Sequence, residues 1–449
     1  MSGKPFVSVL GVDGRPLMPC TGKRARLLLT KSRAFVRRHI PFTIQLKDRN
    51  QDDCHLQPLQ VKIDPGSVYT GLAVVRPDRS GEVTVISLYE LEHRGKQISR
   101  KLKRRLAFRR GRRSQKTRYR KARFLNRTRP EGWLPPSLQH RVDTTTSWVY
   151  KLMARYPVTS IWIESVKFDM QKLRNPDITN KEYRYGTLYA REMKEYLLEK
   201  WQHKCAYCDT QDVTRFEMDH WYPKSSGGSD AIGNRVLACH PCNQRKSNLP
   251  PEVFLSHDLD RYNRIKRVLK TPLKDVAVVN STRNAIVSKL EATLLPVYKS
   301  TGGRTKYNRL EFGIPKTHAL DAVCVGDVMG VKNWKRKTLV VSCDGRGRYS
   351  RTTLDKNGFP KLYLLRKKYA FGFATGDYVL VNKPKYRNNP ACIFTGRVTV
   401  RQNGGFSVDV NGVAKGASYR ACVLLQRSDG YRYRLRHLDE APAPNFINI

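Results

Sequence analysis

Acidic residues are scarce in this sequence of 449 residues. Its 38 aspartates and glutamates face 85 lysines and arginines, which gives a formal net charge of +47. Charged residues make up 27% of the chain, close to the roughly 25% of ordinary globular proteins, so the imbalance lies in the sign of the charge. A compact fold with this surplus would repel itself unless a polyanion neutralised it, and a nucleic acid is therefore the expected partner.

Long apolar runs are also lacking. No stretch approaches the roughly 18 apolar residues of a membrane span, and the apolar run FVSVLGV near the start is too short for a secretory signal. We therefore expect a cytoplasmic protein with no membrane partner. Hydrophobic residues at 39% suffice for real cores, which argues against a disordered basic tail protein.

Cysteine is too rare and too clustered for a disulfide scaffold. Cys205-x-x-Cys208 and Cys239-x-x-Cys242 are separated by thirty residues, a spacing typical of a structural zinc site with four thiolate ligands. His203 or His240, beside these ligands, could replace one of them, and four unrelated buried cysteines are the alternative. The remaining cysteines are expected to be small buried apolar residues: Cys20, Cys54, Cys324, Cys343, Cys392 and Cys422.

The most basic stretch runs from residue 94 to residue 129, where 18 of 36 residues are lysine or arginine and none is acidic. Ile98, Leu102 and Leu106 recur every four residues, which predicts a long helix with a narrow apolar seam that anchors it to a core. Tyr119, Ala122 and Leu125 continue the stripe. The alternative is a charged face that only contacts solvent. Arginine, however, can form bidentate hydrogen bonds to phosphate and stack on bases, which favours a nucleic-acid contact. The candidate nucleic-acid contacts are Arg104, Arg105, Arg109, Arg110, Arg112, Arg113, Arg118, Arg120 and Arg123.

Three segments far apart in the sequence carry candidate catalytic groups at the ends of expected elements. Asp64 ends the first strand of a three-stranded meander, and Glu164 ends the apolar strand VTSIWIES. His318 and Asp321 share one face of an apolar helix expected over residues 316–330. Near the start of the chain, residues 15–20 form an expected proline-bracketed turn. From residue 337 onward, short strands and glycine turns predict a compact β module in the form of a small barrel.

The insert between the two cysteine pairs contains Glu217-Met218-Asp219-His220 and, further on, Asn234 and Asn243. It resembles the HNH nuclease family, a ββα-metal fold. The resemblance implies that His220 is the general base, that Asp219 and Asn243 hold one magnesium ion, and that Asn234 supports the loop or orients the histidine. Hydrolysis of a phosphodiester needs a base near neutral pH and a hard cation with oxygen ligands. A zinc ribbon that only binds nucleic acid is the alternative.

The order Asp64, Glu164 and then His318-x-x-Asp321 resembles the ribonuclease-H-like nuclease fold of the RuvC family. There the corresponding residues converge on two magnesium ions, which clamp the attacking and leaving oxygens. Asp64 alone, before a Pro-Gly turn, would more often be only a turn residue.

The whole chain resembles the IscB family of compact, transposon-encoded, RNA-guided nucleases, which are related to the effector of type II CRISPR systems. Pro16-Leu17-Met18-Pro19 matches the PLMP signature of that family. The implied fold is a multidomain α/β protein with a RuvC-like core split in three segments, an inserted HNH domain with a four-cysteine frame, a bridge helix and a β-rich C-terminal module. The implied domains are a PLMP domain (1–55), RuvC-like segments (56–93, 131–200 and 253–335), the bridge helix (94–130), the HNH domain (201–252) and the β module (336–449).

The family resemblance further implies the activity and the partners. A large structured guide RNA would pair with one strand of a double-stranded DNA, and the protein would read a short adjacent motif. The HNH site would cut the paired strand and the RuvC-like site the displaced strand, in a monomeric ribonucleoprotein in a prokaryotic cytoplasm. The β module would contact the RNA stem and the short adjacent motif in the DNA. Its candidate contacts, each equally plausible as a generic phosphate contact, are Arg346, Arg348, Arg351, Arg432, Arg434 and Arg436.

Two other functions fit part of the sequence. The first is an RNA-dependent DNA-binding protein that does not cut. The second is a protein-only HNH endonuclease of the homing type, which leaves the second carboxylate site unexplained.

Overall fold

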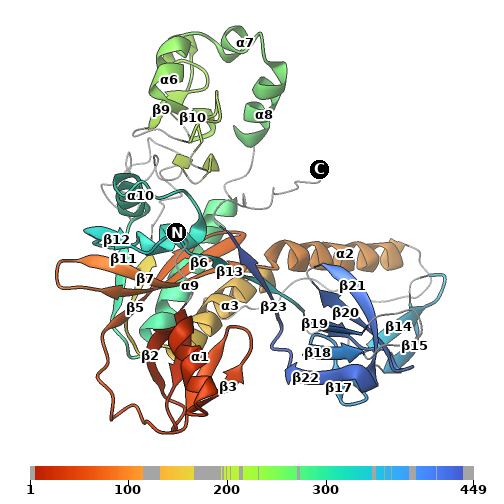
Figure 1. Cartoon of the computed structure of the whole chain (residues 1–449). Coiled ribbons are helices and arrows are strands. Elements are labelled where there is room, and N and C mark those ends of the chain that lie inside the picture. Colours follow the sequence, from red (N-terminus) through yellow and green to blue (C-terminus); the bar gives the residue numbers. More distant parts are fainter. Residues whose placement is uncertain are drawn as a thin grey trace.

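The computed structural model describes residues 6–114, 132–165, 194, 197–198, 200–202, 204–211, 216–230, 232–269, 274–345, 350–357, 359–365, 367–383, 391–410 and 412–437. In this part of the chain no helix has both the length and the apolar character needed to cross a membrane. Figure 1 shows a central sheet with its helices, a unit built on β9, β10 and α6 at the top, a small unit with α1 at the lower left, and a β module at the lower right.

The N-terminal unit is a four-stranded sheet in the order β2-β1-β4-β3, packed against one helix. Its elements are β1 (Phe6–Leu10), β2 (Pro16–Thr21), α1 (Gly22–Thr30), β3 (Ala34–Arg38) and β4 (Thr43–Leu46). The prediction of a turn over residues 15–20 is wrong, because the chain already turns at Gly14, which has φ 77°. Strand β2 lies at the edge of its sheet, where the missing N–H groups of Pro16 and Pro19 are tolerated.

The central sheet has eight strands, in the order β11-β8-β5-β6-β7-β13-β23 with β12 paired to β7. Strands β5, β6 and β7 form the expected antiparallel meander, and β8, β11 and β13 add to it in parallel. The strands are β5 (Leu59–Pro65), β6 (Tyr69–Pro77), β7 (Glu82–Glu92), β8 (Val158–Glu164), β11 (Val297–Ser300), β12 (Gly330–Lys332), β13 (Thr338–Cys343) and β23 (Tyr431–Arg436).

Helices cover both faces of this sheet, as the alternation of side chains along β5 requires. Leu59, Val61 and Ile63 pack in one core with α3 (Pro136–Met153) and α9 (Lys274–Glu291). The opposite face, which carries Asp64, lies beneath α11 (His318–Val323), and α10 (Gly302–Glu311) packs against α11. Both faces of the sheet therefore carry an apolar core, and the polar strand ends at Asp64 and Glu164 lie on the face toward α11.

Helix α11 approaches the sheet so closely that only glycine fits beneath it. A Cβ atom on Gly71 of β6 would lie 1.7 Å from the carbonyl oxygen of His318. The helix is also shorter than the predicted 316–330, because Asn308 donates hydrogen bonds to the carbonyls of Cys324 (2.9 Å) and Gly326 (2.8 Å) and so stabilises a non-helical turn. The catalytic candidates of α11 thus occupy its only two turns.

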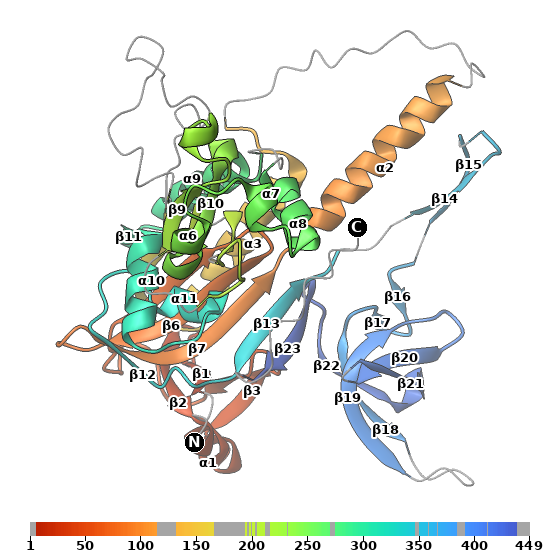
Figure 2. The ribbon, with the colours of Figure 1, turned by 90° about the horizontal axis from the view of Figure 1, so that it is seen from above.

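The arginine-rich segment forms helix α2 (Gly95–Ser114), which projects away from the central sheet (Figure 2). The expected anchoring seam is confirmed only near its start. Ile98 and Leu102 are half-buried, but Leu106 is 44% exposed, and α2 has no fully buried residue. The reason is that α2 packs on α3 near its beginning and then leaves the protein body. The predicted contacts Arg118, Arg120 and Arg123, and the stripe Tyr119, Ala122 and Leu125, lie outside the described residues.

The C-terminal module is a five-stranded antiparallel sheet in the order β21-β20-β19-β18-β22. It is not a closed barrel in the described residues, because β21 and β22 each pair with only one neighbour. Strand β13, which was expected in the module, and β23, an unpredicted strand within the expected module bounds of 336–449, lie instead in the central sheet. The strands of this region are β14 (Ser350–Leu354), β15 (Pro360–Leu365), β16 (Tyr369–Ala370), β17 (Phe373–Ala374), β18 (Tyr378–Lys383), β19 (Cys392–Thr399), β20 (Gly405–Val410), β21 (Val413–Ser418) and β22 (Cys422–Gln426).

The isolated cysteines divide into two groups. Cys324, Cys343 and Cys422 are buried, as predicted, whereas Cys20 and Cys54 are half-buried and Cys392 is exposed. Strand β19 begins at Cys392 on the surface of the module, so this residue was wrongly assigned to a core.

Candidate active sites

The first candidate site lies on the face of the central sheet beneath α11. Ile63 of β5 pairs with Ile163 of β8, so the next residues along these parallel strands, Asp64 and Glu164, point to the same face. His318 of α11 completes the approach, with its Nδ1 atom 2.6 Å from Oδ2 of Asp64. The three sequence segments that carry these residues therefore meet at the carboxyl ends of β5 and β8.

Each carboxylate of this site faces a basic side chain. Glu164 accepts a hydrogen bond from Nη2 of Arg283 at 3.2 Å, and Asp321 lies 3.0 Å from Nε of Arg309. Burial lowers the pKa of His318, but the carboxylate of Asp64 outweighs it and raises the pKa to about 9. Burial and the negative charge of Asp64 raise the pKa of Asp321 to about 6. The last effect shows that the two carboxylates are close enough to repel each other.

The chemistry of these carboxylates suits a divalent cation, although their oxygen atoms do not all lie within 4.8 Å of one another as the thiols of the four cysteines do. Carboxylate oxygens such as those of Asp64, Glu164 and Asp321 are what a hard cation prefers, and a cation between Asp64 and Asp321 would relieve their mutual repulsion. A Cβ atom on Gly302 would lie 3.1 Å from Oε1 of Glu164, so a glycine at the start of α10 leaves the space beside this carboxylate open.

Glu90, which sequence reasoning missed, is a further acidic residue of this face. Gly71 of β6 pairs with Asp64 of β5 on one side and with Glu90 of β7 on the other, so the two acidic residues share a face of the sheet. The charge of Glu90 contributes to the raised pKa of His318. Glu90 is buried and accepts two hydrogen bonds from Arg436, at 2.8 and 2.6 Å. A glutamate within the apolar strand sequence VTVISLYELE was the only signal that could have identified it.

The second candidate site is built on an antiparallel hairpin followed by a helix. Strand β9 (Phe216–His220) pairs with β10 (Arg235–Cys239), and α6 (His240–Lys246) follows directly. Helices α7 (Pro251–Phe254) and α8 (Leu259–Leu269) complete the unit around a core of its own. The structure therefore has the predicted ββα arrangement.

His220, the predicted base, ends strand β9, and its Nε2 atom lies 2.9 Å from Oδ1 of Asp230. Asp230 is also held by Lys224 at 2.7 Å and by Arg235 at 2.6 Å. The hydrogen bonds from Lys224 and His220 lower the pKa of Asp230, which keeps this carboxylate ionised. Sequence reasoning missed Asp230, since a single aspartate in a glycine-rich loop carries no motif.

Asn234 supports the loop after the histidine rather than the histidine itself. Its Oδ1 atom accepts a hydrogen bond from the amide of Tyr222 at 2.8 Å. Its Nδ2 atom donates to the carbonyls of Tyr222 and Ser229, both at 2.9 Å. Of the two roles expected for Asn234, the structure shows the loop role.

The predicted magnesium ligands of the hairpin have different partners. Asp219 accepts a hydrogen bond from the hydroxyl of Tyr207 at 2.5 Å and lies 3.0 Å from Nζ of the buried Lys246. Asn243 donates instead to Oε2 of Glu217 at 2.6 Å. Glu217 and Asp219 are two residues apart on β9 and so share a face, toward α6. This group of oxygen ligands fits a hard cation and includes Glu217, which the sequence prediction omitted.

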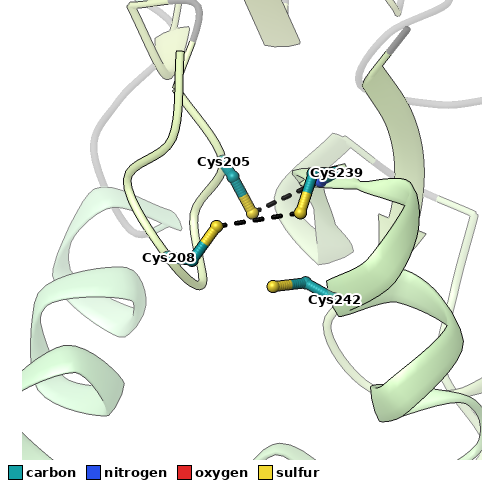
Figure 3. Close-up of side chains that lie close together, drawn as sticks. All are labelled: Cys205, Cys208, Cys239 and Cys242. Carbon is teal, nitrogen blue, oxygen red and sulfur yellow. Dashed lines mark hydrogen bonds between the residues drawn. The ribbon is translucent and has the colours of Figure 1, made fainter. Parts of the chain in front are cut away.

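The four cysteines of the two CxxC pairs converge at the base of the same unit (Figure 3). Their sulfur atoms lie within 4.8 Å of one another, and those of Cys208 and Cys239 are 3.7 Å apart. Burial raises the pKa of the Cys205 thiol to about 11, so a cation is needed to hold it as a thiolate. The cluster fits zinc. His240 lies 2.9 Å from Glu217, away from a ligand role, and His203 is outside the described residues.

Comparisons with known proteins identify two segments of the chain. Residues 7–186 match the family described as RRXRR protein, and residues 205–249 match the HNH endonuclease family. The chain matches no curated protein.

Similar solved structures include Streptococcus thermophilus Cas9 in complex with the GGAA PAM, at 15% identity and a TM-score of 0.23, over 58% of this chain and 32% of that chain. Another is the Type II-C Cas9 enzyme from Actinomyces naeslundii, at 15% identity and a TM-score of 0.16, over 44% of this chain and 29% of that chain. The chain thus spans about a third of the length of the Cas9 chains it matches.

Proposed function

Because an RRXRR region and an HNH endonuclease domain in one chain mark a nuclease related to IscB and Cas9, we propose that this protein is an RNA-guided DNA endonuclease with two cutting sites. The observation that carries the proposal is the contact of Asp64 with His318, which joins distant segments into a second acidic site beside the HNH domain. A protein-only HNH endonuclease has no use for this second site.

The charge distribution supports a long nucleic acid as partner. Helix α2 bears exposed arginines along most of its length and no acidic residue, and beyond α3 it projects where a phosphate backbone could reach it, although Arg112 near its end is half-buried over the ring of Phe359. The overall charge of +47 calls for many phosphates, more than a short duplex offers. We therefore assign α2 to a large structured guide RNA, with Arg104, Arg105, Arg109, Arg110, Arg112 and Arg113 as its described contacts.

In the HNH domain, His220 would accept the proton of the attacking water, and Asp230 would keep its imidazole in place. Glu217, Asp219 and Asn243 would hold one magnesium ion near the scissile phosphate. Lys246 already balances the charge of Asp219 and secures the end of β9 through its 2.7 Å hydrogen bond to the carbonyl of His220. This site would cut the DNA strand that pairs with the guide.

On the central sheet, Asp64, Glu164 and Asp321 would hold two magnesium ions, in the manner of a ribonuclease-H-like core split in three segments. His318, whose charge Asp64 stabilises, would orient that carboxylate and move a proton at its Nε2 atom. Bound magnesium supplies charge neutralisation at the phosphate and at the leaving oxygen. This site would cut the displaced strand. The four-cysteine cluster would hold a structural zinc.

The proposal is tested with protein expressed together with its native flanking DNA. The purified protein is incubated with a plasmid library that matches the co-purified RNA, with magnesium, with and without prior ribonuclease treatment. We expect cleavage next to one short motif, abolished by ribonuclease. Cleavage that resists ribonuclease would indicate the protein-only nuclease instead, and RNA-dependent binding without strand breakage would leave the non-cutting binding protein.

A further inference from the structure

A second group of metal-binding side chains lies at the base of α2, away from the four cysteines. His93, His140 and Cys343 each place a ligand atom within 4.8 Å of the other two. Two groups of this kind occur among the described residues, and the other one is the four-cysteine cluster. Neither nuclease site uses any of these three residues.

The fold explains why the three residues meet. Glu92 of β7 pairs with Ser342 of β13 in parallel, so the next residues along each strand, His93 and Cys343, are neighbours. Both point to the face covered by α3, as Leu91 and Val341 do two residues earlier. His140 projects from α3 onto this point, and the rings of His93 and His140 meet edge to face with centroids 6.4 Å apart.

One nitrogen of the group is buried without a partner. Nε2 of His93 lies 2.8 Å from the hydroxyl of Thr70, but its Nδ1 atom is buried and forms no hydrogen bond within the described part of the chain. The residue is only 7% exposed, so water does not readily satisfy this atom. A buried imidazole nitrogen without a partner is costly, and a metal ion would remove that cost.

The other two residues are held only loosely. The amide of Arg94 lies 3.3 Å from Nε2 of His140, and the hydroxyl of Thr144 lies 3.5 Å from its Nδ1 atom. The sulfur of Cys343 lies 3.9 Å from the same hydroxyl. Both contacts of His140 are longer than the usual range of about 2.7–3.2 Å, and the thiol of Cys343 is only a weak hydrogen-bond donor, so no strong hydrogen bond commits either ligand elsewhere.

The protonation states suit metal binding. Burial and the positive charge of Arg141 hold the pKa of His93 well below its ordinary value, and burial and Arg94 lower the pKa of His140. Both imidazoles are therefore neutral near pH 7, the form in which they bind metals. Burial raises the pKa of the Cys343 thiol to about 11, so the metal would have to displace its proton. The negative charge of the resulting thiolate would offset the positive charges of the nearby Arg94 and Arg141.

We propose that His93, His140 and Cys343 bind a second zinc ion, which fastens the base of α2 to α3 and to the central sheet. Two imidazoles and one thiolate form a borderline-soft ligand group typical of zinc, and a fourth position remains for water or the hydroxyl of Thr144. Tetrahedral zinc needs ligand atoms about 3.5 Å apart, so small side-chain rotations would close the group around the ion. Only Arg94 separates His93 from the first residue of α2. The metal would therefore fix the direction in which the arginine-rich helix leaves the protein.

The test is a count of zinc per full-length chain by native mass spectrometry and elemental analysis. We expect two zinc ions in the unsubstituted protein and one in Cys343→Ser. Cys205→Ser should also retain one zinc ion, and the variant that combines Cys343→Ser with Cys205→Ser should retain none. Cys422→Ser removes a buried cysteine of the C-terminal module and is the matched control, which should retain two.

His140→Gln provides a second route, because His140 is half-buried and its replacement disturbs packing less than a change at Cys343. It too should lose one zinc ion. In the unsubstituted protein, cobalt substitution should give sulfur-to-cobalt absorption from two sites, of which Cys205→Ser removes only one. A single zinc per chain that disappears in Cys205→Ser would overturn the proposal, as would two zinc ions that persist in both Cys343→Ser and His140→Gln. None of these readouts depends on nuclease activity, so they stand or fall separately from the proposed function.

Discussion

The imidazole Nδ1 atom of His318 lies 2.6 Å from Oδ2 of Asp64, although the two residues are 254 positions apart in the sequence. This contact joins the end of β5 to the start of α11. It places a charged histidine beside a carboxylate on one face of the central sheet, while His220 and Asp230 form a separate pair in the HNH domain. These two histidine–carboxylate pairs thus lie in two bodies with separate cores.

The two sites should be separable by substitution. His220→Ala should leave a nick only in the displaced strand, and Asp64→Ala a nick only in the guide-paired strand, because each change removes one site and leaves the other body folded. The measurement is strand-specific cleavage of end-labelled DNA by the ribonucleoprotein. Loss of both cuts in either variant, with RNA binding and folding intact, would contradict the division of labour.

Asp230 should matter through His220. Asp230→Asn should reduce nicking of the guide-paired strand by roughly 10²-fold, the lower end of what a positioned general base contributes, and leave the other strand unaffected. Lys224→Gln is the matched control, since Lys224 binds the same carboxylate from an exposed position without touching the histidine. Equal losses in the two variants would assign Asp230 to loop stability alone.

The four-cysteine cluster should be required for the HNH domain but not for the central sheet. Cys205→Ser or Cys242→Ser removes one of four zinc ligands, so the domain should lose one zinc ion and its nicking activity. Cys392→Ser, an exposed cysteine of the C-terminal module, should change neither quantity. Full zinc content together with full nicking in Cys205→Ser would exclude the zinc site.

The buried ion pair between Glu90 and Arg436 should contribute more to stability than an exposed one. Arg436→Gln leaves Glu90 charged and buried, which should cost about 3–5 kcal/mol in urea unfolding. The side chain of Arg432 is 58% exposed and lies 3.0 Å from Asp344, so Arg432→Gln should cost no more than about 1 kcal/mol. Similar costs for both would mean that β23 is not held by its buried pair.

Binding of the guide RNA should depend on salt through α2. Replacing Arg104, Arg105 and Arg109 together by Gln should reduce the slope of log affinity against log salt by about 0.7–0.9 for each phosphate contact that is lost. The same triple change at Arg24, Arg26 and Arg33, on the N-terminal unit, tests whether any basic surface gives this effect. If the slope falls equally in both variants, α2 has no special share in RNA binding.

The sequence was informative where the signals are local. The match to the HNH endonuclease family covers residues 205–249, and the strands, helix and cysteine pairs there follow one another without interruption, so the motifs of this segment were enough to show the resemblance that implied the ββα arrangement. The strand ends at Asp64 and Glu164 were likewise predicted, since apolar runs with clear ends mark buried strands.

Features that depend on distant partners could not be predicted. Arg436 and Glu90 are 346 positions apart, and neither residue is marked by its neighbours, so β23 was assigned to the C-terminal module. The sequence of β2 predicts a turn, because Pro16 and Pro19 are poor strand formers except at a sheet edge, and edge position is a tertiary property. The apolar seam of α2 was over-interpreted, since periodicity reveals a stripe but not whether protein covers it.

The order of strands in the central sheet has a consequence for synthesis on the ribosome. The meander β5-β6-β7 can form early, but His318 and Asp321 emerge much later, and β23, which pairs with β13, comes near the end of the described chain. Non-local strand pairing of this kind is slow and leaves edges exposed until it is complete. A nascent chain would therefore display its arginine-rich helix, ready for RNA, well before its carboxylate site is assembled.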